Sequence, residues 1–326
     1  MLAVGPNGVG KTNLLEAIHV ATQGFSPRTR TDAQLVRFGD DGTRAAVTGR
    51  RGEVTLEIEL RIRPGEGKRA KVNGAVLRAA EQLRSAVSTL VFTPDRLGVI
   101  KAGPAARRAY FDRALGRLLP ARATLPAEYG AAVAQRNAAL RRAGGGFSSA
   151  EAVEPWSEQA ATLGAELVAS RLETLEILGP SFSERAGELG LPEATLRYEG
   201  EPPTREALDA ALARDLERGT TSLGPHLDDI VLSSADRDLR NFGSQGEQRL
   251  ALLALLLAEA EAITARSGVS PLLLLDDVLS ELDPARRRIL AERVRGAGQA
   301  LITATDAAML PAEPDQLLEV TPGAVT

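Results

Sequence analysis

The feature that most constrains this chain is a glycine-rich run close to its start. Residues 5–12 read G-P-N-G-V-G-K-T and match the spacing of a phosphate-binding loop, G-x-x-x-x-G-K-[ST]. Met1–Val4 predicts the end of a buried strand, and apolar residues recur at helical spacing between Leu14 and Val20. Strand, loop and helix in this order predict a site that binds the phosphates of a nucleotide.

The residues of this loop are expected to divide the work of binding. Backbone N–H groups can face the phosphates because glycine tolerates unusual backbone angles, and the helix N-terminus adds positive charge. Lys11 is expected to reach the β- and γ-phosphates and to act in catalysis, and Thr12 to ligate Mg²⁺. The complete predicted nucleotide-binding set is Gly5, Pro6, Asn7, Gly8, Val9, Gly10, Lys11 and Thr12.

A second motif lies at 272–277, where four leucines precede two aspartates. Such an apolar run is typical of a strand buried in a parallel sheet, and ligands bind beyond the carboxyl ends of these strands. We expect Asp276 to hold Mg²⁺ through water and Asp277 to orient or deprotonate the attacking water. The structural alternative is a buried strand followed by an acidic helix cap.

The third motif, G-S-Q-G-E-Q-R at 243–249, precedes an apolar helix and resembles the signature of ATP-binding cassette proteins. In that superfamily the signature of one subunit faces the γ-phosphate bound to the other. The residues expected to act in this way are Ser244, Gln245, Gly246, Glu247 and Gln248. The structural alternative is a capping box between Ser244 and Glu247, and both interpretations can hold together.

Two further segments resemble cassette motifs. Ser280 and Asp283 resemble the D-loop that crosses the dimer interface, although Asp283 before Pro284 also fits a helix cap. Residues 300–305 predict a buried strand at the switch position, where Thr305 or Thr303 would contact the γ-phosphate.

Composition excludes several classes of function. The chain has no cysteine and only two histidines, His19 and His226, which excludes disulfides and thiolate metal sites. No apolar run reaches the roughly 18 residues of a membrane span, so we expect a cytoplasmic protein. The net charge of -4 argues against a protein that coats DNA non-specifically, but a local basic face stays possible.

The order of patterns predicts an α/β fold: a phosphate-loop NTPase head with a mixed sheet lobe, a helical second lobe and no long coiled coil. Alternation across 53–63 predicts a half-buried strand, and Asn73-Gly74 predicts a hairpin turn. Between residues 104 and 189 the spacing is helical, with a break at 144–146. We expect lobe I at 1–92 plus 270–326 and lobe II at 93–269.

Beyond the nucleotide motifs, the chain resembles the RecF family of ATP-binding cassette ATPases. The similar stretches are 24–29 (GFSPRT), 35–39 (LVRFG), 91–97 (VFTPDRL), 103–112 (GPAARRAYFD) and 224–229 (GPHLDD). The resemblance implies a head like those of SMC and Rad50 proteins, an ATP-dependent homodimer on single- and double-stranded DNA, and slow ATP hydrolysis. It also implies a role in recombinational repair and replication-fork maintenance, loading recombinase with RecR- and RecO-like partners.

The chain departs from the family pattern at three places. Pro27 stands where the family has His, and Leu227 stands where it has Arg, which removes a positive charge from a loop that could meet phosphate or DNA. The family also has strands before the phosphate loop that help build the adenine side of the pocket. Since the loop here begins at Gly5, we expect a truncated or misassigned start.

Basic residues of lobe I form a candidate DNA face, although ordinary solvation explains any single one of them. They are Arg28, Arg30, Arg61, Arg63, Lys68, Arg69 and Lys71, with Arg37 in the same region. Alternative functions are the ATPase subunit of a membrane transporter, a long-armed chromosome ATPase and a nucleotide-free scaffold remnant. The interval between Lys11 and Ser244 is too short for long arms.

Overall fold

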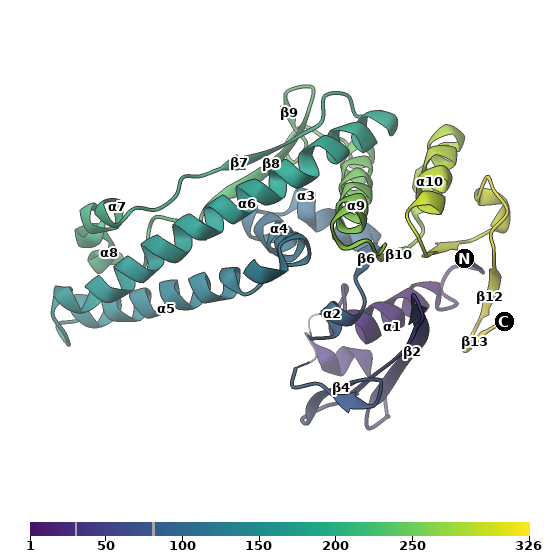
Figure 1. Ribbon diagram of the computed structural model, residues 1–326, viewed down its shortest axis with the longest axis horizontal. Helices are drawn as coiled ribbons and strands as arrows, with labels where there is room; N and C mark the ends of the chain where they lie inside the picture. Colours follow the sequence, from purple (N-terminus) through teal and green to yellow (C-terminus); the bar gives the residue numbers. More distant parts are fainter. Residues whose placement is uncertain (30, 80–81) are drawn as a thin grey trace. The chain divides into compact units, whose positions relative to one another are not determined.

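The computed structural model describes residues 1–29, 31–79 and 82–326. They form two compact units (Figure 1). Unit 1 combines Met1–Leu97 with Ile263–Thr326, and unit 2 is Gly98–Ala262. The junctions lie a few residues from the lobe boundaries expected from the sequence, and the signature motif belongs to unit 2.

Unit 1 is a two-sheet α/β unit. Its strands are β1 (Leu2–Val4), β2 (Thr43–Arg51), β3 (Val54–Arg63), β4 (Gly67–Val72), β5 (Ala75–Val76), β6 (Thr89–Phe92), β10 (Leu272–Leu275), β11 (Ala300–Ala304), β12 (Leu317–Thr321) and β13 (Ala324–Val325). Its helices are α1 (Lys11–Gln23), α2 (Leu83–Ala86) and α10 (Pro284–Gly296), with 3-10 turns at Asp32–Leu35, Pro94–Leu97, Val278–Glu281 and Ala307–Met309.

The larger sheet of unit 1 has the strand order β13-β12-β1-β11-β10-β6. Pairing is parallel from β12 to β6, and β13 is antiparallel to β12. The leucines of β10 are mostly buried, as expected of a strand covered on both faces. In the register, Leu275 lies opposite Phe92 of β6 and Ile302 of β11. Asp276 therefore leaves the sheet between the ends of β6 and β11.

The second sheet is antiparallel, in the order β2-β3-β4-β5. On β3, Ile58, Leu60 and Ile62 are buried and their neighbours in sequence are not, which confirms the expected alternation over 57–63. At the start of the strand the expectation is wrong, since Val54 is exposed. The hairpin turn is also confirmed, since Asn73 and Gly74 both have positive φ, 48° and 79°.

Helix α1 packs against both sheets. Leu15 belongs to a core cluster with Val91, Leu274 and Leu301 of the parallel sheet. Val20, one turn further on, belongs to the cluster formed by the buried residues of the antiparallel sheet. Because the phosphate loop leads directly into α1, both sheets hold the loop in place.

Unit 2 is mainly helical. Its helices are α3 (Gly98–Lys101), α4 (Pro104–Leu118), α5 (Leu125–Gly144), α6 (Glu154–Glu188), α7 (Arg205–Ala210), α8 (Leu212–Arg218) and the start of α9 (Gln245–Ser267), with 3-10 turns at Pro120–Arg122 and Ala150–Val153. A three-stranded antiparallel sheet joins β7 (Thr195–Glu199), β8 (Asp229–Ser234) and β9 (Arg237–Asp238). Helices α5 and α6 lie side by side, which confirms the break predicted at 144–146 (Figure 1).

A buried ion pair joins α5 to α8. Arg136 and Asp215 are both fully buried, and the guanidinium lies 2.7 Å from the carboxylate. Ser157 of α6 and Thr221 also accept hydrogen bonds from Arg136. Buried charges are stable only when they are paired and hydrogen-bonded, as these are. The cluster therefore holds α5, α6 and α8 together.

Candidate nucleotide site

The phosphate loop has the backbone geometry that its glycines allow. Gly8 and Gly10 have φ of 83° and 112°, and Gly10 is the N-cap residue of α1. A Cβ on Gly5 would lie 2.4 Å from the carbonyl oxygen of Val320, so only glycine fits there. The Lys11 ammonium donates to the carbonyls of Gly5 (2.6 Å) and Pro6 (2.9 Å), which holds it over the loop.

The loop and the acidic strand end meet at one carboxylate. The hydroxyl of Thr12 donates to Oδ1 of Asp276 over 3.1 Å. The same oxygen accepts a hydrogen bond from the hydroxyl of Thr303 over 2.8 Å. Hydroxyl and carboxylate oxygens are ligands that Mg²⁺ prefers, so Thr12 and Asp276 fit the cation expected here.

Asp277 has a strained backbone. Its φ of 48° lies in the left-handed region, which is uncommon for a residue with a side chain. Its N–H donates to the Thr303 hydroxyl (2.9 Å), and its carbonyl accepts from the Ser280 hydroxyl (2.8 Å). One of its carboxylate oxygens is buried with no hydrogen-bond partner among the described residues. A carboxylate that caps a helix would accept a backbone N–H, so the unpaired oxygen favours contact with a ligand over a capping role.

Thr93 also lies at this edge of the sheet, directly after β6. Its hydroxyl is buried and has no hydrogen-bond partner in the described part of the chain. Buried hydroxyls ordinarily form hydrogen bonds, so the Thr93 hydroxyl is available to a ligand bound at the sheet edge beside Asp276. Sequence reasoning missed Thr93, which lay inside a recognised stretch but outside any motif with a known spacing.

The signature segment forms the expected capping box. The Glu247 N–H donates to the Ser244 hydroxyl (3.2 Å), and the Ser244 N–H donates to the Glu247 carboxylate (2.7 Å). The hydrogen bonding from Ser244 to the carboxylate lowers the pKa of Glu247. Gln248 donates to the Leu239 carbonyl (2.8 Å) and fixes the preceding turn. The box leaves the N-terminus of α9 open to an anion; contact by Gln245 and Gly246 with a second subunit stays a prediction.

The signature helix is anchored within unit 2 by Glu259, which is 1% exposed. Its carboxylate accepts hydrogen bonds from the Tyr110 hydroxyl (2.6 Å) and from Arg117 (2.5 Å), both on α4. Leu250 to Leu257 of α9 are buried as well. The acidic residue that interrupts the apolar run is therefore a buried partner of α4.

Two of the family-like stretches meet in unit 2. Arg107 is 2% exposed and holds Asp229 through two hydrogen bonds of 2.7 and 2.6 Å. Arg108 donates to the carbonyl of Asp228 (2.5 Å), and Tyr198 donates to its carboxylate (2.6 Å). The pairing joins residues 103–112 to residues 224–229, a contact that no local sequence pattern reveals.

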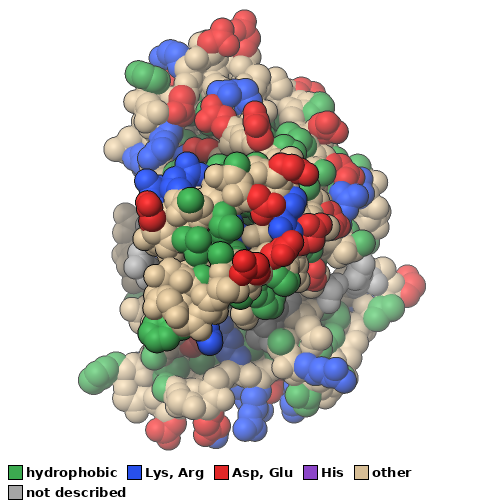
Figure 2. Space-filling model, turned by 90° about the vertical axis from the view of Figure 1, so that its left-hand side faces the viewer, with side chains coloured by type: hydrophobic (Ala, Val, Ile, Leu, Met, Phe, Trp, Pro, Cys, Tyr) green, Lys and Arg blue, Asp and Glu red, His purple; other side chains and the backbone are tan. Residues whose placement is uncertain are grey.

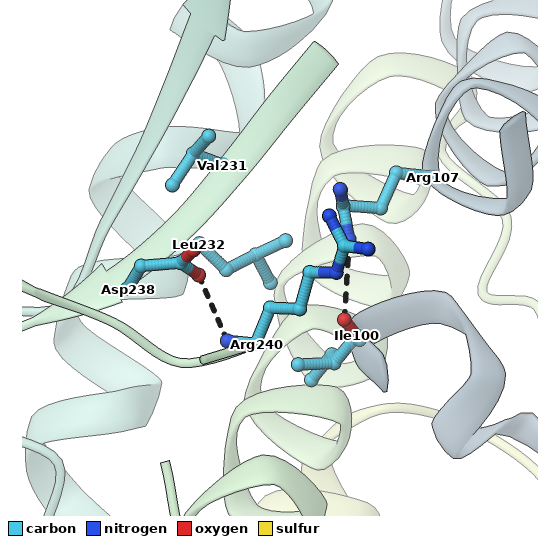
Figure 3. A pocket seen from close by; sticks show the side chains of 6 residues that line it. All are labelled: Ile100, Arg107, Val231, Leu232, Asp238 and Arg240. Atoms are coloured by element: carbon cyan, nitrogen blue, oxygen red, sulfur yellow. Dashed lines mark hydrogen bonds between the residues drawn. The ribbon is translucent and has the colours of Figure 1, made fainter. Parts of the chain in front are cut away.

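A small hollow lies beside this pair (Figure 3). It is lined by Ile100, Arg107, Val231, Leu232, Asp238 and Arg240. In Figure 3 the side chain of Arg240 extends toward that of Arg107, which donates to the Ile100 carbonyl (3.1 Å). The space suits about one water molecule, so it is too small for a nucleotide.

The switch and D-loop residues differ in their surroundings. Thr303 is fully buried, and its hydroxyl hydrogen-bonds Asp276 and Asp277. Thr305 is exposed, so the predicted contact with a γ-phosphate remains a prediction for Thr305 alone. Asp283 accepts a hydrogen bond from the Arg286 N–H (2.9 Å) and caps α10. Ser280 is exposed next to Asp277.

The antiparallel sheet carries a row of arginines. Arg44, Arg61 and Arg69 are aligned across β2, β3 and β4, with Arg61 in the middle. Glu59 pairs with Arg44 (2.7 Å) and Arg61 (2.7 Å), so part of the charge is compensated. Arg44 was absent from the predicted DNA set and is found only through the strand register.

The other predicted DNA residues have varied surroundings. Arg28 pairs with Glu16 on α1 (3.1 Å), and Lys68 pairs with Asp32 (2.8 Å). Arg63 lies 3.6 Å from Glu66, and Lys71 is exposed on β4. Arg30 lies outside the described residues. Figure 2, which views the molecule from the left-hand side of Figure 1, shows acidic and basic side chains intermixed on that face.

No group of three or more His, Asp or Glu side chains suited to a metal ion occurs among residues 1–29, 31–79 and 82–326. Within the same ranges, no helix has both the length and the apolar character needed to cross a bilayer.

The phosphate loop, the acidic strand end and the capped signature helix define a nucleotide-binding head of the ATP-binding cassette type. A family model described as RecF/RecN/SMC N terminal domain matches residues 1–325. Proteins named DNA replication and repair protein RecF are 37% identical in Heliobacterium modesticaldum and 39% identical in Anaeromyxobacter sp. (strain K). Both alignments cover 93% of this chain and 85% of the relative. The chain belongs to the RecF family.

Solved structures agree with this assignment. The structure of the recombination mediator protein RecF-ATP in the RecFOR pathway is 29% identical, with a TM-score of 0.89 over 100% of this chain and 90% of that one. The corresponding RecF-ATPrS structure gives a TM-score of 0.85 over 99% and 90%. An Smc head domain derived from Pyrococcus furiosus is 19% identical, with a TM-score of 0.57 over 99% and 88%, and shows the shared fold alone.

Proposed function

We propose that this protein is a cytoplasmic, Mg²⁺-dependent ATPase of DNA repair and replication that closes on a second copy of itself to hold DNA. The observation that carries the proposal is the hydrogen bond between Thr12 and Asp276, which joins the phosphate loop to the acidic strand end. The names of the relatives and the ATP in the similar RecF structure support the choice of nucleotide and pathway.

Each residue of the site has a proposed task. Lys11 neutralises the β- and γ-phosphates, and Thr12 and Asp276 hold Mg²⁺, which when bound offsets charge that develops on the phosphates. Asp277 orients the attacking water and accepts its proton, a role that its unpaired buried oxygen supports. Thr305 faces the γ-phosphate from the switch position.

The second copy supplies the signature. Ser244 and Gly246 at the start of α9 contact the γ-phosphate on the partner, because a capped helix N-terminus attracts anions. Ser280 and Asp283 lie at the interface as the D-loop. Hydrolysis requires both copies and is slow, so ATP binding closes the dimer and hydrolysis resets it.

DNA binds to the basic side chains of unit 1, led by the arginine row of the antiparallel sheet. Junctions of single- and double-stranded DNA are the proposed substrate, with RecR- and RecO-like mediators as partners in loading recombinase. Membership in the RecF family argues against a transporter subunit.

The test is ATP hydrolysis by the purified protein with and without gapped DNA. Wild type is expected to hydrolyse ATP slowly and faster with DNA. Lys11→Met is expected to abolish nucleotide binding, and Asp277→Asn to bind ATP without hydrolysing it. Failure of wild type to bind ATP would favour a nucleotide-free scaffold and contradict the proposal.

A further inference from the structure

The geometry points to Thr303 as a positioning residue for both aspartates of the site, a role that rests on the proposed ATPase function. Thr303 lies in β11, the parallel neighbour of β10, and is 0% exposed. It touches no solvent, so its hydroxyl can act only through the groups that it bonds inside the protein.

Both hydrogen bonds of that hydroxyl go to the acidic pair. The proton is donated to Oδ1 of Asp276 (2.8 Å), and the oxygen accepts the N–H of Asp277 (2.9 Å). A hydroxyl has a single proton, so these bonds fix its orientation. A single side chain thereby sets the direction of one carboxylate and the backbone of the next residue.

The bond to Asp276 aims its carboxylate. Oδ1 accepts hydrogen bonds from both the Thr12 and the Thr303 hydroxyls. Loss of the Thr303 donor would leave the carboxylate free to rotate away from the position that suits Mg²⁺. Groups that orient a metal ligand commonly change metal affinity when they are removed.

The bond to Asp277 supports a strained backbone. The residue has a φ of 48°, a conformation that persists only where its surroundings enforce it. The N–H of Asp277 is the group that Thr303 holds, which ties this turn to β11. Without the bond, the turn can relax, and the unpaired carboxylate oxygen of Asp277 loses its placement.

The experiment compares three variants. Thr303→Val keeps the shape and removes the hydroxyl, whereas Thr303→Ser keeps the hydroxyl. Thr89→Val is the matched control, because Thr89 is also fully buried in the same sheet and its hydroxyl bonds Thr22. Measured quantities are kcat, KM for ATP, and the Mg²⁺ concentration that half-saturates Mg²⁺-dependent binding of a fluorescent ATP analogue.

We expect Thr303→Val to lower kcat by roughly 10- to 100-fold and to raise the Mg²⁺ requirement, with KM changed little. Thr303→Ser should restore kcat to within about threefold of wild type, since it keeps a hydrogen bond of that strength. Equal kcat and Mg²⁺ requirement in Thr303→Val and Thr89→Val would overturn the inference, provided that wild type hydrolyses ATP.

Hydrogen exchange tests the inference even if Thr303→Val is unstable or the ATPase proposal fails. In wild type the Asp277 amide should be protected to the same degree as the amides of β10, although it lies beyond the strand. Rapid exchange of that amide in the folded wild-type protein would overturn the inference, and protection would support it.

Discussion

Thr12 and Asp276 are 264 residues apart in the chain, yet the hydroxyl of one donates to the carboxylate of the other over 3.1 Å. The contact arises because β1, which leads into the phosphate loop, and β10 both pair with β11 in one parallel sheet. Their carboxyl ends therefore open on the same edge, where α/β proteins bind ligands.

The first prediction concerns the cation. Asp276→Asn should raise the Mg²⁺ concentration needed for tight ATP binding at least about tenfold, because an amide oxygen is a weaker ligand than a carboxylate. Titration of a fluorescent ATP analogue at several Mg²⁺ concentrations measures this. Asp209→Asn, at an exposed carboxylate of α7, is the control. An unchanged Mg²⁺ requirement in Asp276→Asn would show that the cation is held elsewhere.

The second prediction concerns the composite site. Lys11→Met removes the phosphate-loop lysine but leaves the signature intact, and Ser244→Arg does the reverse. Each variant alone should be inactive. In an equal mixture half of the dimers pair one of each and hold a single complete site, so roughly a quarter of wild-type ATPase activity should return.

The control for that experiment is Lys11→Met alone at the same total protein concentration. If the mixture stays inactive although dimers of one variant with the other do form, the signature does not act on the partner's nucleotide. Activity in Ser244→Arg alone would lead to the same conclusion.

The third prediction concerns DNA. Replacing Arg44, Arg61 and Arg69 together with Gln should weaken DNA binding and reduce the slope of log K against log salt by about 2 to 3, since each phosphate contact contributes roughly 0.9. Fluorescence anisotropy at several salt concentrations measures the slope. The control replaces Arg142, Arg197 and Arg218, which are exposed in unit 2. Equal slopes in both triple variants would place the DNA elsewhere.

The fourth prediction concerns pH. Burial lowers the pKa of His226 below its ordinary value of 6.5, and its ring bonds the Tyr129 hydroxyl over 2.7 Å. At this histidine the unfolded chain therefore binds a proton more readily than the folded chain. The stability that the neutral ring contributes is present above pH 6.5 and is lost as the pH falls through the folded-state pKa of His226. Urea unfolding at pH 7.5 and pH 5.5 should show this loss, and His226→Gln should lessen it. If His226→Gln loses as much stability between pH 7.5 and pH 5.5 as wild type does, the pH dependence comes from other groups.

The sequence predicted the elements that depend on local patterns. The phosphate loop, the alternation over 57–63 of β3, the Asn73–Gly74 turn and the capping box at Ser244 each have a short spacing with a known physical basis. These features need only neighbours in the chain, and the structure confirms each of them.

What the sequence did not predict depends on pairing between distant strands and helices. The contacts of Thr303, the unpaired hydroxyl of Thr93 and the arginine row through Arg44 follow from strand register, which no local pattern encodes. The same is true of Arg107 and Asp229, which are 122 residues apart. Their charges gave no sign that they would be paired with each other.

The most direct test of the account is the mass of Asp277→Asn by size-exclusion chromatography with light scattering, with and without ATP and Mg²⁺. Because this variant should bind ATP without hydrolysing it, a shift from about 34 kDa to about twice that mass is expected, with ATP present. Adding Lys11→Met to the same chain should abolish the shift. A monomer that binds ATP but keeps its mass would contradict the claim that ATP closes two copies on each other.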